Sequence, residues 1–259
     1  MISHLSTPFE SVGCNDCRNS SLLDFDFIMA FQPILDLRSG KPYAYEALVR
    51  GTQGESAYSI LSKVDDHNRY RFDQACRVRA IQQAAALGLT ELPNCHLSIN
   101  FLPKAVYRPE VCIRATLEAC EEFQFPGPQL IFEVSESEDT GDSTHLVSIF
   151  KEYQRQGFLT AIDDFGAGYA GLNLLAKFQP DILKIDMELI RGIHENGPKQ
   201  AILKGVLTAS REMGIEVIAE GIESPMERDH LMDLGVYLQQ GFLFARPLVN
   251  ELPLNEVNL

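Results

Sequence analysis

The chain has 259 residues, of which 45% are hydrophobic and 22% charged, so it can bury a sizeable core and is neither collagenous nor disordered in type. Its formal net charge of -14 gives a field that repels nucleic acid and anionic membrane surfaces, so DNA is not an expected partner. No stretch approaches the ~18 consecutive apolar residues of a membrane span, and the N-terminus lacks a signal-peptide pattern. We expect a cytoplasmic protein with one large domain.

Residues 1–25 are rich in Ser, Asn and Asp and show no periodicity, which predicts a flexible N-terminal arm. Cys14 and Cys17 form a C-x-x-C pair in this arm with no second pair, which favours chance or a weak redox role over a structural zinc site. The other four cysteines lie in or beside apolar segments, where buried, reduced thiols are expected; they are Cys76, Cys95, Cys112 and Cys120.

The folded body is predicted to open with a hairpin of two strands, 27–37 and 42–50, joined across Ser39, Gly40 and Lys41. Residues 69–87 then carry apolar side chains at three- and four-residue spacing and stop before Gly88, which is typical of an amphipathic helix.

From residue 96 onward, predicted strands alternate with predicted helices. The strands are 96–101, 129–136, 158–163, 181–186, 215–220 and 236–241, and the helices are 109–123, 143–156, 171–178, 198–213 and 225–234. This alternation implies right-handed crossovers and a mostly parallel sheet. The chain length and the eight strands favour an α/β fold of the TIM-like (β/α)₈ barrel type over residues 26–259, with one antiparallel strand from the opening hairpin.

Polar residues interrupt these strands at informative places, because a buried parallel strand is otherwise an almost continuous apolar run. One interruption lies inside an apolar strand and the others lie at or near strand ends; they are Glu46, Asn100, Glu133, Asp163, Asp164, Lys184, Glu220 and Gln240. In a barrel the carboxyl ends of the parallel strands meet at one mouth, where catalytic residues lie in this architecture. We therefore expect these side chains to converge.

Each of these residues also has a purely structural interpretation. Asp164 and Glu220 could each be a helix N-cap or a surface charge, and Glu46 could pair with Arg50 or a backbone amide. Lys184 could pair with Asp186 or Glu220. Asn100 could form a turn, and Gln240 could form a hydrogen-bond bridge in the sheet. Their recurrence at successive strand ends favours a shared site.

Four or five carboxylates at one mouth repel one another, since two unit charges ~4 Å apart cost about 4 kcal/mol at an effective dielectric constant of about 20. A single lysine is too little to offset this repulsion, so divalent cations are expected. All the donors are oxygens of Glu, Asp and Asn, without His or Cys, which points to Mg²⁺ or Mn²⁺ rather than zinc. Two such ions about 3.5–4 Å apart hydrolyse phosphate esters by in-line attack. The pattern predicts a metal-dependent phosphoesterase.

The adjacent carboxylates Asp163 and Asp164 need a special backbone, because neighbouring side chains inside a strand point to opposite faces. Both can reach one site only where the chain leaves the strand. Gly166 and Gly168 follow at once and are expected to let the backbone turn there and stay close to the site.

The ordered motifs resemble those of the EAL-domain family of cyclic di-GMP phosphodiesterases over about residues 26–250. They are EALVR, which begins at Glu46, then INF, FEVSE, DDFGAGY, KID, EGIE and QGFLFARP. The resemblance implies hydrolysis of the bacterial second messenger cyclic di-GMP to linear pGpG, with two Mg²⁺ or Mn²⁺ ions per active site, by a homodimer. The alternatives are a non-catalytic cyclic di-GMP receptor that signals through a protein partner, and a scaffold that uses only its outer helices.

The resemblance also implies residue roles. The metal ligands would be Glu46, Asn100, Glu133 and Asp163 for one ion, and Asp163, Asp164 and Glu220 for the second. Lys184 would orient or polarise the attacking water, and Gln240 would support the site by hydrogen bonding. Leu48 and Arg50 would contact the substrate, and Glu223 would anchor the DDFGAGY loop.

The departures from the family pattern are mild. Ala167, Ala170 and Ile222 stand where the family often has Thr, Ser and Val, and Ala167 removes one hydroxyl from a loop that couples dimerisation to metal binding in the family. No ligand position is lost, which implies an active enzyme.

No sensor or DNA-binding motif fits before the barrel, so regulation is expected from dimerisation, a protein partner or the pair Cys14 and Cys17.

Overall fold

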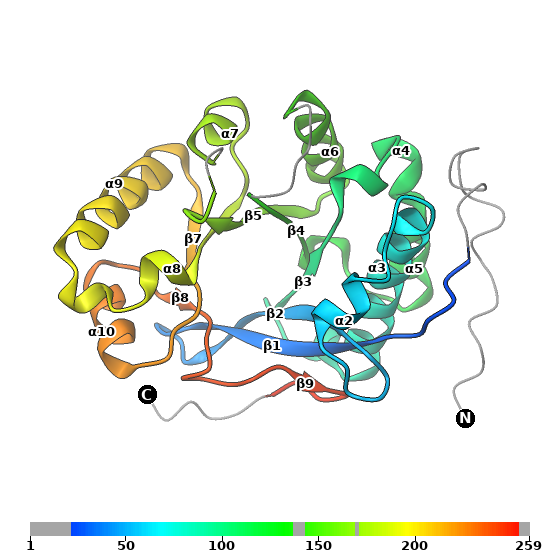
Figure 1. Cartoon of the computed structure of the whole chain (residues 1–259), viewed down its shortest axis with the longest axis horizontal. Coiled ribbons are helices and arrows are strands. Elements are labelled where there is room, and N and C mark those ends of the chain that lie inside the picture. Colours follow the sequence, from blue (N-terminus) through cyan, green and yellow to red (C-terminus); the bar gives the residue numbers. More distant parts are fainter. Residues whose placement is uncertain (1–21, 137–142, 169–170, 254–259) are drawn as a thin grey trace.

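Eight strands close into a barrel with helices around its outside in the computed structural model, which describes residues 22–136, 143–168 and 171–253 (Figure 1). In their order around the barrel the strands are β1 (Ile28–Asp36), β2 (Lys41–Arg50), β3 (His96–Asn100), β4 (Leu130–Ser135), β5 (Leu159–Phe165), β6 (Ile182–Ile185), β7 (Glu216–Ala219) and β8 (Leu238–Gln239). A short strand, β9 (Leu248–Val249), pairs with β1 outside the barrel.

Strand β1 is antiparallel to both of its barrel neighbours, β2 and β8, and every other neighbouring pair of barrel strands is parallel. The hairpin turn between β1 and β2 is closed by amide hydrogen bonds from Ser39 and Gly40 to the carbonyl of Asp36, at 3.2 and 2.8 Å. Gly40 has a φ of 67°, a conformation that glycine adopts without strain. The predicted TIM-like barrel with one antiparallel strand is therefore confirmed.

The helices follow the predicted order, with short additions. They are α2 (Ala57–Leu61), α3 (Arg69–Ala86), α4 (Pro109–Cys112), α5 (Arg114–Glu122), α6 (Ser143–Arg155), α7 (Gly171–Lys177), α8 (Met187–Ile190), α9 (Gly197–Met213) and α10 (Pro225–Asp233). Single 3₁₀ turns lie at Leu89–Glu91, Pro103–Ala105, Gly127–Gln129 and Ile193–Glu195. The predicted helix 109–123 is divided at Ile113, and α2, α8 and β9 were not predicted, because elements this short carry too few residues to show a period.

Apolar side chains fill the inside of the barrel below its mouth. One comes from each barrel strand except β3; they are Ile34, Ala44, Ile131, Ala161, Ile182, Ile218 and Leu238. The outer faces of the strands pack against the helices in a larger apolar core, in which the Phe132 ring lies 4.8 Å from that of Tyr153 on α6. The barrel thus has a mainly apolar floor, and the polar strand-end residues gather above it.

The chain before β1 is described from Leu22 onward. Leu23 and Phe25 pack against the apolar core, with the Phe25 ring 6.1 Å from that of Phe72, so the end of the predicted arm is attached to the barrel. The rest of the arm, with Cys14 and Cys17, lies outside the described residues.

The four predicted thiols are free cysteines; Cys76, Cys95 and Cys112 are buried and Cys120 is half-buried. Within the described ranges, none of the helices combines the length and apolar character needed to cross a bilayer.

Candidate active site

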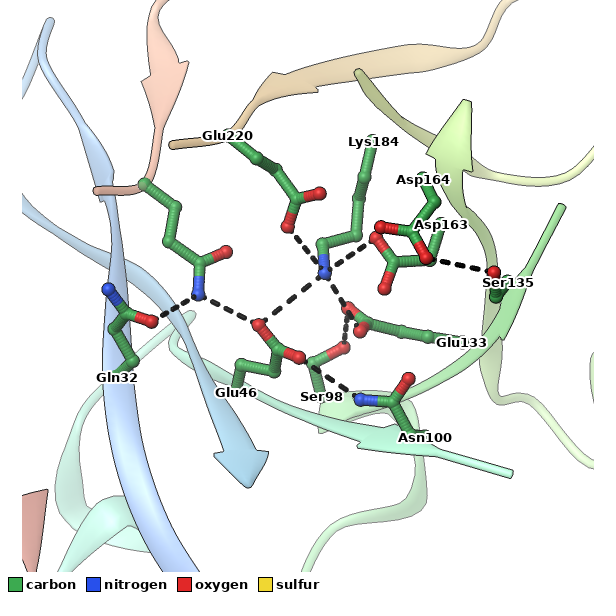
Figure 2. A network of polar contacts seen from close by, with 11 residues as sticks. Gln32, Glu46, Ser98, Asn100, Glu133, Ser135, Asp163, Asp164, Lys184 and Glu220 are labelled. Carbon is green, nitrogen blue, oxygen red and sulfur yellow. Dashed lines mark hydrogen bonds and ion pairs between the residues drawn. The ribbon is translucent and has the colours of Figure 1, made fainter. Parts of the chain in front are cut away.

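The polar strand-end residues lie together at the mouth of the barrel (Figure 2). On six parallel strands, an inner apolar residue is followed two positions later by a polar one, because alternate residues of a strand point the same way. The pairs are Ala44 and Glu46, Ile131 and Glu133, Ala161 and Asp163, Ile182 and Lys184, Ile218 and Glu220, and Leu238 and Gln240. The predicted convergence of these side chains is confirmed.

The fully buried ammonium of Lys184 lies at the centre of four carboxylates. Its Nζ lies 2.8 Å from Oε1 of Glu220, 2.9 Å from Oε2 of Glu133, 3.0 Å from Oδ1 of Asp163 and 3.5 Å from Oε2 of Glu46. Burial alone would lower the pKa of Lys184, but these carboxylates raise it well above its usual range, so the lysine is charged.

One ammonium does not balance the negative charge around it. Burial raises the pKa of Glu133 to about 8, and the neighbouring carboxylates Glu46 and Asp163 act in the same direction. Burial followed by the charge of Asp163 also raises the pKa of Glu220 and of Asp164. A site that penalises its own ionised carboxylates in this way favours the binding of further positive charge.

Glu46 is held by two side-chain amides. Asn100 Nδ2 donates to Oε1 at 3.0 Å, and Gln240 Nε2 donates to Oε2 at 2.8 Å. Gln240 Nε2 also lies 3.3 Å from Oε1 of Gln32, whose own Nε2 donates to the carbonyl of Ala245 at 3.1 Å. Gln32 was not predicted, although a glutamine inside the apolar strand β1 is the same signal that singled out Glu46.

These contacts decide between the alternatives for two residues. Among the described contacts of Glu46 the partners are Asn100, Gln240 and Lys184, rather than Arg50. Of the two partners considered for Lys184, Glu220 does pair with it, at 2.8 Å. Asp186 instead caps helix α8, where its Oδ1 accepts a hydrogen bond from the amide of Glu188 at 2.7 Å.

Two serines that were not predicted hold carboxylates of the site. Ser98 on β3 donates its hydroxyl to Oε1 of Glu133, and Ser135 on β4 donates to Oδ2 of Asp164 at 2.8 Å. Both could have been found by period, because Ser98 precedes Asn100 by two residues and Ser135 follows Glu133 by two.

Asp163 and Asp164 reach the same site because the backbone changes conformation at the second of them. Asp164 has a φ of 55°, in the left-handed region that aspartate tolerates better than most residues. The pairing of β5 with β6 is irregular between Ile162 and Phe165, which marks the same place as a bulge. The expected role of the glycines is therefore corrected in part: the turn begins at Asp164 itself and continues at Gly166, whose φ is 103°.

Gly168 lies close to the side chain of Glu136. A Cβ placed there would lie 3.0 Å from Oε1 of Glu136, whose Oε2 accepts a hydrogen bond from the amide of Gly166 at 2.9 Å. Glu136 thus ties this loop to the barrel, as does the hydrogen bond from Ser135 to Asp164. Glu223, which was predicted to anchor the loop, is half exposed and forms a 2.5 Å ion pair with Arg191; its anchoring role stays a prediction. Ala170 lies outside the described residues.

The predicted substrate contacts, Leu48 and Arg50, lie on the last residues of β2, beyond Glu46 toward the mouth. Both are half-buried, and Arg50 Nη1 donates to the carbonyl of Val49 at 2.7 Å. Burial lowers the pKa of Arg50, while the charge of Glu46 raises it. Among the described residues, the hydrogen bond to Val49 uses only one of the guanidinium donors.

The carboxylates form two groups that suit divalent cations. One group is Glu46, Glu133 and Asp163, the other is Asp163, Asp164 and Glu220, and in each group one oxygen per residue lies within 4.8 Å of the others. Asp163 belongs to both groups. The donor set is all oxygen, which fits Mg²⁺ or Mn²⁺ better than zinc.

A closed barrel whose mouth gathers carboxylates around a buried lysine defines the class of TIM-like barrels with an acidic mouth at the carboxyl ends of the strands. The EAL domain family model matches residues 17–247, so the chain belongs to the EAL domain family.

Solved structures of similar proteins carry the same fold. A standalone versatile EAL protein from Vibrio cholerae, in its c-di-GMP bound form, is 52% identical with a TM-score of 0.85, covering 90% of this chain and 96% of that one. A manganese and cyclic di-GMP complex of Klebsiella pneumoniae BlrP1 at pH 6 is 35% identical with a TM-score of 0.82, covering 89% of this chain and 58% of that one.

Curated relatives are longer. The antirepressor BluF of Escherichia coli, which is regulated by blue light and temperature, is 34% identical over 224 residues, which is 86% of this chain and 55% of BluF. The cyclic di-GMP phosphodiesterase PdeR of Escherichia coli is 28% identical over 155 residues, which is 60% of this chain and 23% of PdeR. The chain thus spans about half, or less, of the length of these two relatives.

Proposed function

We propose that the chain hydrolyses one phosphodiester bond of cyclic di-GMP to give linear pGpG, using two Mg²⁺ or Mn²⁺ ions. The observation that carries this proposal is the pair of carboxylate groups that share Asp163 around Lys184. The Vibrio cholerae structure, which has c-di-GMP bound and is matched over 96% of its length, supports the choice of substrate.

The carboxylates would hold the ions in two sets that share one member. Glu46, Glu133 and Asp163, with the amide oxygen of Asn100, form one set, and Asp163, Asp164 and Glu220 form the other. Bound ions would offset the carboxylate charge, polarise the phosphodiester and activate a water molecule.

The remaining side chains would bind and orient. Lys184 is a hydrogen-bond donor held by four carboxylates, so it would orient an oxygen of the water or the phosphate rather than accept a proton. Gln240 would keep Glu46 in place through its 2.8 Å hydrogen bond. Arg50 would pair with a phosphate of the substrate, and Leu48 would contact its apolar surface.

A cyclic di-GMP receptor that signals through a protein partner is the second candidate function. The relative that favours it is BluF, which is described as an antirepressor. The intact set of carboxylates around Lys184 favours the enzyme. Catalysis needs the complete set of metal ligands, whereas a receptor needs only the residues that bind the dinucleotide. The homodimer, a regulatory protein partner and the cytoplasmic location stay predictions.

The direct test is to incubate the purified protein with cyclic di-GMP and Mg²⁺ or Mn²⁺ and to separate the products by chromatography. We expect pGpG from the wild type and none from Glu46→Ala. Glu216→Gln is the matched control, because Glu216 is exposed at the first residue of β7 and lies away from the mouth, so its product yield should equal that of the wild type. Tight binding without cleavage in either metal would favour the receptor instead.

A further inference from the structure

Ser98 occupies an exceptional position in the barrel. Every other barrel strand contributes an apolar residue to the inner floor, and β3 contributes none. The residue of β3 that precedes its site residue, Asn100, by two positions is Ser98, which is fully buried. A floor residue on β3 therefore carries a hydroxyl where the equivalent residue of the other parallel strands, such as Ala161 on β5, is apolar.

A buried hydroxyl is costly unless it forms a hydrogen bond, whereas an alanine of similar size costs nothing of this kind. The partner of the Ser98 hydroxyl is Oε1 of Glu133. The other carboxylate oxygen, Oε2, accepts from Lys184 Nζ at 2.9 Å. Glu133 is almost fully buried, so these two contacts fix the direction in which its carboxylate faces the other acidic groups.

We propose that Ser98 is a positioning residue that fixes the Glu133 carboxylate for a divalent cation and favours Mg²⁺ or Mn²⁺ over Ca²⁺. This inference rests on the proposed function, since it assumes that Glu133 binds a cation. Each oxygen of Glu133 accepts one hydrogen bond, Oε1 from Ser98 and Oε2 from Lys184, so the carboxylate is kept from turning to bring both oxygens to one ion. Ca²⁺ often takes both oxygens of a carboxylate, whereas Mg²⁺ takes single oxygens in a small, regular shell. A carboxylate whose direction is fixed by the Ser98 hydrogen bond therefore penalises the larger ion.

The test measures metal binding itself, by titration calorimetry with Mn²⁺ and then with Ca²⁺ in the absence of substrate. The variants are Ser98→Ala, which removes the hydroxyl, and Ser98→Thr, which keeps it. Ser210→Ala is the matched control, because Ser210 is also buried but lies on helix α9, away from the mouth. Thermal unfolding in the absence of metal reports whether each variant is folded.

Partners of ligating side chains typically contribute 10- to 100-fold to metal affinity, so we expect Mn²⁺ to bind Ser98→Ala about 10-fold more weakly than the wild type. The affinity of Ser98→Ala for Ca²⁺ should fall less than its affinity for Mn²⁺, so the ratio of Mn²⁺ to Ca²⁺ affinity should fall. Ser98→Thr should keep the wild-type ratio, and Ser210→Ala should keep the wild-type affinities.

Three outcomes would overturn the inference. Unchanged Mn²⁺ affinity in Ser98→Ala would show that the hydroxyl does not position Glu133. An equal loss for both ions would show a general disturbance of the site. If the wild type bound no Mn²⁺, the proposed function would fail together with this inference. If the wild type binds Mn²⁺ and cleaves cyclic di-GMP, either of the first two outcomes would refute the role of Ser98 and leave the proposed function standing.

Discussion

The hydroxyl of Ser135 donates a 2.8 Å hydrogen bond to Oδ2 of Asp164, a residue whose φ of 55° lies in the left-handed region. The last residue of β4 therefore holds the side chain at the point where β5 leaves the regular pairing with β6. The conformation of Asp164 brings two consecutive carboxylates to one site.

The strain at Asp164 can be measured by comparing two neutral substitutions. Asparagine adopts the left-handed region readily and keeps the acceptor for Ser135, whereas alanine does neither. We expect Asp164→Ala to lower the free energy of unfolding by about 1 to 2 kcal/mol relative to Asp164→Asn, as measured by urea unfolding. Both should lose most cleavage activity, since both lack the charge. Equal stability of the two variants would contradict the strained backbone.

Replacing Lys184 should make the stability of the barrel depend on metal. Lys184→Met removes the ammonium that four carboxylates share, and breaking a buried charge pair costs roughly 3 to 5 kcal/mol. Thermal unfolding in EDTA should show a large loss for this variant. Saturating Mg²⁺ should restore much of it, because ions that bind only the folded state stabilise that state. The idea fails if Lys184→Met and wild type unfold at the same temperature in EDTA.

Two glycines should respond to alanine in opposite directions. A Cβ at Gly241 would lie 2.1 Å from the carbonyl oxygen of Ile222, so Gly241→Ala forces apart the two chain segments that carry Glu220 and Gln240. We expect a loss of roughly 3 kcal/mol or more in the free energy of unfolding. Gly205 lies inside helix α9 with open space around it, and Gly205→Ala should gain about 0.5 to 1 kcal/mol. Denaturant curves of both variants check this, and a stable Gly241→Ala protein would refute the close contact.

Glu227 should make a stabilising contribution that disappears in acid. Burial would raise its pKa, but hydrogen bonds from the amides of Gly192, Glu223 and Ser224 lower it below the ordinary value of 4.5. A carboxylate with a lowered pKa stabilises the fold above its ordinary pKa, and this contribution is lost as the pH falls through the lowered value.

Glu227→Gln should therefore be less stable than the wild type by about 1 to 2 kcal/mol at pH 7, and the difference should shrink as the pH falls below about 4. Unfolding curves at several pH values measure it. Glu212→Gln, an exposed change on helix α9, serves as the control and should show no such trend. If the difference in unfolding free energy between Glu227→Gln and the wild type grew as the pH fell, the claim that folding lowers the pKa of Glu227 would be wrong.

The fold and most of the site could be predicted because their signals are local. A charged residue such as Glu133 or Lys184 inside a buried strand has few explanations, and the period of two places it on the same face as the apolar residue before it. Ser98 and Gln32 escaped prediction because they are uncharged and lie inside β3 and β1, whereas the uncharged residues Asn100 and Gln240 lie at or near strand ends.

Other features depend on contacts that a sequence does not express. Asp164 has its positive φ where the pairing of β5 with β6 is irregular, and its side chain is held by Ser135 on a different strand. The short helix α8 is capped by Asp186, whose carboxylate was open to interpretation as a partner of Lys184 until its contact with the amide of Glu188 was seen.

Closure of the barrel by β1 has a consequence for the order of events during synthesis. Gln240 reaches Glu46 across 194 residues of chain and Gln32 across 208, so both contacts wait for nearly the whole barrel to leave the ribosome. In a nascent chain that stops before β8, the sheet is not closed and Glu46 lacks its hydrogen bond from the side-chain amide of Gln240. The mouth is therefore completed only after the last strand of the barrel has been made.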